Sequence, residues 1–177
     1  DTLPNESKKI IVENSNNINL KKDLISKYDN IEVIMSKNMG MGAGNNIGLK
    51  SCQSQYAYVL NPDTKLKKDT LKNLVEELSN VSDFTIASPL NDNINIPNYN
   101  IIDTNFENKN ILSVDRIDGF SMLFNLSKFK TKDFFDENFF LYLENDDLCL
   151  RVKKKMQNIY IIKNALINHK GSISKNQ

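Results

Sequence analysis

Short runs of β-forming residues alternate with helical patterns along the chain, and this alternation constrains the fold more than any other feature. Helical spacing of Leu and Ile is present at 20–28 and again at 71–78. The strand-like runs, rich in Ile, Val and aromatic residues, are 9–12, 31–35, 56–60 and 83–87. Strands that alternate with helices form a sheet that helices cover. We therefore predict an α/β fold with a largely parallel sheet.

A second series of elements follows a long irregular segment. Residues 91–113 are rich in Asn, contain Pro97 and show no periodicity, and such a loop in a compact domain is usually functional or mobile. No repeat or linker divides the chain, so we expect one domain over residues 1–177. The later elements are expected to be strands at 119–124 and 159–162 and a helix at 144–157, with Cys149, Val152 and Met156 as its buried stripe.

Charge and composition exclude several classes of function. Lys and Arg total 23 against 22 Asp and Glu, a formal net charge of +1, which argues against nucleic acid as a partner. No apolar run approaches the ~20 residues of a membrane span. Cys52 and Cys149 are too few and too far apart for a disulfide framework, which favours a cytoplasmic location. The single histidine, His169, makes Ser–His or Cys–His catalysis a poor explanation.

Glycine occupies alternate positions from 40 to 44 within the segment 38–48. Glycines here let the backbone approach a ligand closely and expose its N–H groups, and a helix N-terminus favours an anion. The dinucleotide fingerprint G-x-G-x-x-G is not completed, because its third glycine is replaced by Asn45 or Ile47, depending on the start. The segment is either a ligand-binding turn or a tight strand-to-helix turn without a ligand.

Acidic residues follow the strand-like run 56–60 and precede the last predicted helix. Asp63 lies where a carboxylate can hold a cation that carries diphosphate oxygens, although Asn-Pro-Asp-Thr is also an ordinary turn sequence. Residues 144–147 read Glu-Asn-Asp-Asp. Acids in a first helical turn also satisfy the helix dipole, and Asn145 is a good N-cap.

Taken in order, these motifs resemble glycosyltransferase family 2, and within it the rhamnosyltransferase-like branch. The resemblance covers about residues 9–174. It implies a GT-A fold, a Rossmann-like three-layer α/β/α sandwich with a mostly parallel mixed sheet. The motifs that carry it are N-x-G-x-G-x-G-N-N-x-G at 38–48, V-L-N-P-D at 59–63, D-G-F-S-M-L-F at 118–124, F-F-D-E-N-F-F-L-Y-L-E-N-D-D-L-C-L-R at 134–151 and H-K-G-S at 169–172.

The resemblance also implies roles for individual residues. Asp63 and His169 would contact a divalent cation, Mg²⁺ or Mn²⁺, or the diphosphate itself, with Asn61 replacing the first acid of the family's D-x-D. Glu144 and Asp147 would be catalytic, with Asn145 as a hydrogen-bond partner of the acceptor. The residues implied to line the nucleotide and donor-sugar side are Glu13, Asn38, Gly40, Asn46, Asn61, Asp118 and Gly119.

Two departures from the family pattern matter. The family begins with a further strand and helix, so we expect the chain to be N-terminally incomplete, with 1–90 as the nucleotide-sugar half and 91–177 as the acceptor half. The acidic motif is usually E-D-x-D with its first Asp as general base, whereas Asn145 cannot take a proton near neutral pH. Helical spacing puts Glu144 and Asp147 on one side and turns Asp146 away, so we predict Glu144 as the base.

The expected function is inverting transfer of a sugar from a nucleoside diphosphate sugar to a hydroxyl of a surface glycan or its lipid-linked precursor. The protein would work in the cytoplasm, peripherally at the inner face of the membrane. One alternative is a non-catalytic remnant that binds nucleotide or glycan. Another is a nucleotidyltransferase, although that class has a basic Gly-rich loop at the N-terminus, where this chain has Leu3-Pro4-Asn5.

Overall fold

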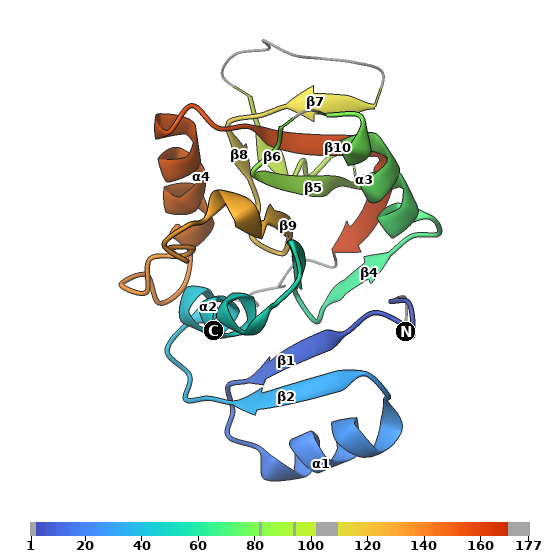
Figure 1. Cartoon of the computed structure of the whole chain (residues 1–177), viewed down its shortest axis with the longest axis vertical. Helices are drawn as coiled ribbons and strands as arrows, with labels where there is room; N and C mark the ends of the chain where they lie inside the picture. The colour runs from blue at the N-terminus through green and yellow to red at the C-terminus, as the bar shows by residue number, and fades with distance from the viewer. Residues whose placement is uncertain (1–2, 82, 94, 102–109, 170–177) are drawn as a thin grey trace.

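A computed structural model describes residues 3–81, 83–93, 95–101 and 110–169 (Figure 1). Its centre is a six-stranded sheet in the order β3-β9-β5-β10-β4, with β7 paired to β10. These strands are β3 (Tyr56–Leu60), β9 (Ser121–Asn125), β5 (Ile86–Asn91), β10 (Ile159–His169), β4 (Thr64–Leu66) and β7 (Ile111–Ser113). The α/β class is confirmed.

The central sheet is mixed, but less parallel than the alternation of elements predicted. Within it only β5 and β10 pair in parallel. The pairs β3–β9, β5–β9, β10–β4 and β10–β7 are antiparallel. The reason is that β9 inserts between β3 and β5 in the opposite direction, and such long-range pairing leaves no local trace in a sequence.

A separate β-α-β unit precedes this sheet. Strands β1 (Lys9–Glu13) and β2 (Ile31–Met35) pair in parallel through helix α1 (Ile18–Lys27). The helix α2 (Met41–Ser51) then packs on β1, since a Cβ added at Gly48 would meet Val12 at 3.5 Å. Helix α1 packs on β2, but none of its residues is buried, and Leu24 of the predicted apolar face is only half-buried. An additional strand and helix before this unit stay a prediction.

Two helices cover opposite faces of the central sheet, α3 (Thr70–Ser79) and α4 (Glu144–Lys154). Successive strand residues point to opposite faces. Accordingly, Ile159 and Ile161 of β10 pack in the cluster that contains Leu148 and Val152 of α4. Tyr160 and Ile162 pack with Leu74 and Leu78 of α3. The result is the expected three-layer arrangement.

Several element boundaries differ from the predictions. The run 83–87 forms a strand only from Ile86, and the last strand continues past residue 162 to His169. Helix α4 ends at Lys154, which leaves Met156 93% exposed rather than in the buried stripe, where Leu148 takes its place beside Cys149 and Val152. The segment 91–113 contains β6 (Tyr99–Asn100), which pairs with β8 (Arg116–Ile117), and β7. Residues 94 and 102–109 of that segment lie outside the described residues.

Candidate functional site

Asp63 and His169 lie side by side at one end of the central sheet. Asp63 belongs to the turn between β3 and β4, where the Asn61 carbonyl accepts hydrogen bonds from the amide and the hydroxyl of Thr64, at 3.2 and 2.6 Å. Strand β4 pairs with the end of β10, and Thr64 is the register partner of His169. This pairing brings Oδ2 of Asp63 to 3.2 Å from Nε2 of His169.

The imidazole of His169 is held from a second side by Phe120. The two rings stack with centroids 4.0 Å apart and planes 14° apart. The carbonyl of Phe120 also accepts a hydrogen bond from the Asn61 amide at 2.9 Å. Strand pairing and ring stacking therefore fix the imidazole beside the Asp63 carboxylate.

A carboxylate and an imidazole are suitable ligands for a divalent cation that also binds substrate phosphates. Among the described residues, no group of three or more His, Cys, Asp and Glu side chains gathers for a metal. A cation at Asp63 and His169 would therefore take its other ligands from diphosphate oxygens and water, and His169 would have to be neutral. The pair fits a cation that the substrate brings, rather than one that the protein encloses.

Arg116 connects two carboxylates next to this pair. Its Nη2 lies 2.9 Å from Oδ1 of Asp118, and its Nη1 lies 3.2 Å from both carboxylate oxygens of Asp146. Asn145 donates from Nδ2 to the Ile117 carbonyl at 3.0 Å and to Oδ1 of Asp146 at 2.8 Å. The start of α4 is thus tied to the segment that follows β8.

The environment of Asp118 raises the pKa of its carboxyl group above the ordinary value. Burial is the largest cause, and the nearby negative charge of Asp146 acts in the same direction. Electrostatic interactions with Arg116 and His169 lower this pKa, without cancelling the effect of burial. Asp118 therefore lies in one electrostatic neighbourhood with His169 and Asp146.

Gly119 lies against the start of α4. A Cβ at Gly119 would lie 3.4 Å from the Cβ of Asn145 and 3.4 Å from the Cε of Met41. Of the residues predicted for the site, Asn61, Asp63, Asp118, Gly119, Asn145 and His169 are therefore collected at the loop between β8 and β9.

The start of α4 is arranged differently from the helical prediction. Asp146 faces Arg116 and does not turn away, whereas Asp147 pairs with Arg151, with Oδ2 and Nε 2.7 Å apart. The N-cap is Leu143 rather than Asn145, so Glu144 is the first helical residue. Glu144 is 1% exposed, and neither of its carboxylate oxygens has a hydrogen-bond partner among the described residues. In this structure its side chain has no access to a ligand in solution.

The glycine segment forms most of α2 rather than a ligand loop. Only Gly40 lies in the turn, where its φ of 99° is favourable for glycine alone and a Cβ would lie 2.2 Å from the Phe140 carbonyl oxygen. The Gly40 amide donates to Oδ1 of Asn38 at 3.2 Å. Inside the helix, a Cβ at Gly44 would lie 2.7 Å from Nδ2 of Asn14. These glycines allow the helix to pack closely, which favours the interpretation of a tight turn without a ligand.

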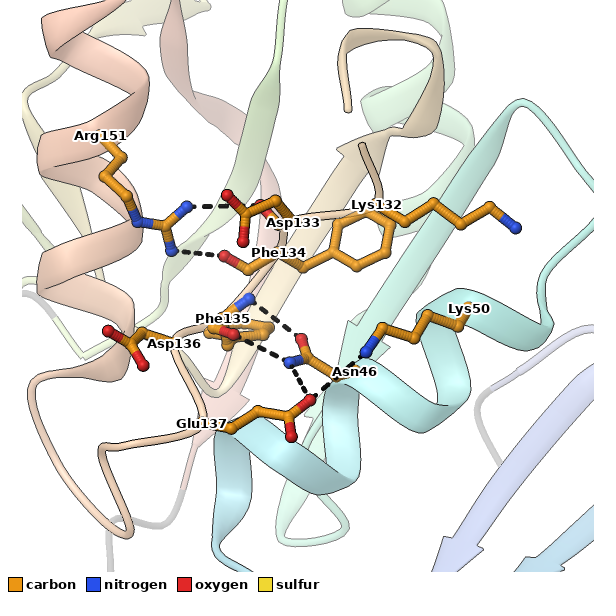
Figure 2. Close-up of a pocket in the computed structure, with 9 residues that line it drawn as sticks. All are labelled: Asn46, Lys50, Lys132, Asp133, Phe134, Phe135, Asp136, Glu137 and Arg151. Carbon is orange, nitrogen blue, oxygen red and sulfur yellow. Dashed lines mark hydrogen bonds and ion pairs between the residues drawn. The ribbon is translucent and has the colours of Figure 1, made fainter. Parts of the chain in front are cut away.

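Asn46 is used to join α2 to the segment before α4 (Figure 2). Its Nδ2 donates to the Phe135 carbonyl at 2.8 Å and to Oε1 of Glu137 at 2.9 Å, and its Oδ1 accepts from the Phe135 amide at 2.9 Å. Lys50 adds an ion pair to Glu137 at 3.3 Å. A pocket of about 380 Å³ opens beside these groups, with Arg151 on its other side. Asn46 is 3% exposed, and its amide is engaged within the protein.

Glu13 is also engaged within the protein. Its carboxylate accepts hydrogen bonds from the Ser15 hydroxyl, from the Ser15 amide at 2.8 Å and from the Asn17 amide at 2.7 Å. The hydrogen bond from the Ser15 hydroxyl is the main reason that the pKa of Glu13 is lowered. Its contact with a nucleoside stays a prediction.

Arg116, on which this arrangement depends, is not among the site residues predicted from the sequence. A signal was available, because Arg116 is one of only two arginines and lies two residues before Asp118. What could not be seen was that Asp146, thirty residues further on, is its second partner.

Comparison with known proteins identifies the class. The sequence model described as Glycosyl transferase family 2 matches residues 4–147, most of the chain. The chain belongs to this family, whose members transfer glycosyl groups. A curated relative, the rhamnosyltransferase WbbL of Escherichia coli K12, is 27% identical in an alignment that covers 83% of this chain and 67% of WbbL.

Solved structures share the fold. GalNAc-T7 with UDP, GalNAc and Mn²⁺ matches 94% of this chain with a TM-score of 0.77 and 13% identity, and this chain spans 38% of its length. The match with TarS of S. aureus covers 94% of this chain and 52% of the TarS chain, with a TM-score of 0.63 and 12% identity. The match with the inositol-1-phosphate CTP transferase of T. maritima covers 96% of this chain and 73% of the transferase chain, with a TM-score of 0.63 and 11% identity. The fold is therefore GT-A, which related nucleotidyltransferases share.

Proposed function

We propose that this chain transfers a sugar, with inversion, from a nucleoside diphosphate sugar to an acceptor hydroxyl. Membership of glycosyl transferase family 2 supports the general reaction. The observation that carries the proposal for this chain is the contact between Asp63 and His169, 3.2 Å apart beside the Asp118 carboxylate. These groups come from separate strands and loops, and their meeting point lies at one end of the sheet, as ligand sites of open α/β sheets do.

The chemistry requires that negative charge on the departing diphosphate be stabilised. Mg²⁺ or Mn²⁺ would supply this stabilisation as a Lewis acid. Asp63 and His169 would hold it, because a carboxylate and a neutral imidazole can both donate to the cation while diphosphate oxygens complete its coordination. The ring of Phe120 stacks on the imidazole of His169 and keeps it in place.

The name of the WbbL relative suggests rhamnose as the first donor sugar to test. The proposed acceptor is a surface glycan or its lipid-linked precursor, reached at the cytoplasmic face of the membrane. Among the residues that the structure describes, no helix combines the length and apolar character that a bilayer crossing needs.

A screen of nucleotide sugars tests the proposal. The purified protein is incubated with each donor and Mn²⁺, and release of nucleoside diphosphate is measured with and without glycan acceptors. Turnover of at least one donor is expected, and Asp63→Asn should abolish most of it. Asp23→Asn, which changes an exposed carboxylate of α1, should leave it unchanged.

A different outcome would support the second candidate, a non-catalytic binding protein. That candidate is favoured by Asn145, whose amide donates to the Ile117 carbonyl where the family has an acid. Nucleotide binding without turnover of any donor would contradict the enzymatic proposal.

A further inference from the structure

The position that usually carries the general base is occupied by an amide, so the chain needs another group to accept the proton. Asn145 has no basic atom near neutral pH, and its Nδ2 is used by Ile117 and Asp146. Inverting transfer still requires a base within hydrogen-bond reach of the acceptor hydroxyl. The carboxylates near Asn145 can be compared by their exposure and by the hydrogen bonds that their oxygens accept.

Three of these carboxylates are unsuitable in the observed geometry. Glu144 is 1% exposed. Asp147 has an oxygen, Oδ1, that accepts no hydrogen bond among the described residues, but its Oδ2 is held by Arg151, which also donates to the Asp133 and Phe134 carbonyls and so ties Asp147 to the segment before α4. Asp146 accepts from Arg116 with both oxygens, and Oδ1 accepts from Asn145 as well.

Asp118 combines an oxygen without a hydrogen bond with a place two residues before Phe120, whose ring stacks on His169. Its Oδ1 accepts from Arg116, while its Oδ2 has no hydrogen bond among the described residues, and its side chain is 32% exposed. It directly precedes Gly119, the residue against which the Asn145 side chain packs. Arg116 and Asp146 also link the Asp118 carboxylate to the Asn145 side chain, which occupies the position of the usual base.

We infer that Asp118 is the general base of this chain and that Arg116 is a positioning residue which holds it through Oδ1. The inference rests on the proposed function and adds to it the group that receives the proton. In the transfer step, the acceptor oxygen forms a bond to the anomeric carbon, and the bond from that carbon to the diphosphate oxygen breaks. The diphosphate leaves with the electron pair, and the acceptor proton moves to Oδ2 of Asp118.

The electrostatic surroundings suit this role. Burial raises the pKa of Asp118 and makes its carboxylate a stronger base than an ordinary aspartate. The titratable or charged groups that act on it are Arg116 on β8, Asp146 on α4 and His169 on β10. Arg116 prevents the repulsion between Asp118 and Asp146 from displacing either carboxylate.

The test compares wild type, Asp118→Asn and Asp115→Asn under donor and acceptor conditions in which the wild type turns over. Asp118→Asn should lower kcat by about 10²–10⁴-fold, the range for loss of general-base catalysis. Its affinity for nucleoside diphosphate, measured by calorimetry, should stay close to that of the wild type. Asp115→Asn changes a neighbouring carboxylate that pairs with Lys153, and it should retain wild-type kcat.

A further variant distinguishes a catalytic role of Asp118 from a purely structural one. Asp118→Glu keeps a carboxylate and should recover part of the activity, with a shifted acidic limb in the pH profile of kcat. If Asp118→Asn turns over at the wild-type rate, or if Glu144→Gln alone removes activity, Asp118 is not the base, while the proposed function stands. If the wild type turns over no donor, the proposed function fails, and the assignment of Asp118 fails with it.

Discussion

Thr64 is the register partner of His169 across β4 and β10, and this single pairing brings the Asp63 carboxylate to 3.2 Å from the imidazole. The two polar groups are more than a hundred residues apart in the sequence. Their contact depends on the short strand β4, which follows the Asn61-Pro62-Asp63 turn and adds an edge to the sheet next to β10. The Asn61-Pro62-Asp63 turn, whose sequence is also typical of an ordinary turn, therefore takes part in the candidate site.

Removal of the Asp63 carboxylate is expected to uncouple nucleotide binding from metal. For the wild type, Mn²⁺ should tighten the binding of a nucleoside diphosphate relative to binding in EDTA. For Asp63→Ala, the two affinities should be equal, because one of the two protein ligands is absent. Calorimetry in both buffers measures the difference, and equal wild-type affinities would contradict the metal assignment.

Arg116→Gln is expected to move the pH dependence of transfer. Arg116 lowers the pKa of Asp118, so its loss should raise that pKa further. Asp118 would then become protonated at a higher pH on acidification, and the acidic limb of the kcat profile should move upward. Lys153→Gln, which removes a partner of Asp115 instead, provides the control and should leave the limb in place.

Gly40→Ala and Gly48→Ala should change stability in opposite directions. At Gly40 the Cβ would overlap the Phe140 carbonyl at 2.2 Å in a backbone of φ 99°, so the variant should be destabilised by more than about 2 kcal/mol. At Gly48 the nearest atom is 3.5 Å away and the backbone is helical, so alanine should stabilise by up to about 1 kcal/mol. Urea unfolding of both variants measures this contrast.

Asn46→Ala should destabilise the protein without direct involvement in chemistry. It leaves the buried amide and carbonyl of Phe135 without their side-chain partner, at a cost of roughly 1–3 kcal/mol for each unsatisfied group. Asn80→Ala removes one exposed hydrogen bond to Glu76 and should cost about 1 kcal/mol or less. Equal unfolding midpoints for the two variants would show that Asn46 does not anchor this segment.

The two cysteines should react with alkylating reagents in a fixed order. Burial raises the pKa of the Cys149 thiol to about 11, so its reactive thiolate is scarce at pH 8 and increases as the pH rises. Cys52 is only partly buried, and its pKa is raised less far. Mass spectrometry after iodoacetamide treatment of the native protein should find Cys52 modified first, and Cys149 modified mainly after unfolding.

Local sequence patterns predicted the helices and strands well, but not which elements and side chains lie next to one another. The strands at 31–35 and 56–60 appear with the expected bounds, because β-branched and aromatic runs ended by turn residues are local signals. The antiparallel insertion of β9 and the burial of Glu144 depend on residues distant in sequence. For the same reason Asp146 was expected to turn away, since helical spacing carries no information about an arginine on another strand.

The order of the central sheet has a consequence for how the protein acquires its shape. Along β3-β9-β5-β10-β4, strands from residues 56–91 alternate with strands from residues 121–169. Strands from the earlier and the later part of the chain are therefore interleaved in one hydrogen-bonded layer. During synthesis, β3, β4 and β5 emerge from the ribosome long before β9 and β10, which separate them in the sheet. The central sheet can close only after residue 169 has been translated, so the site and the core are completed together.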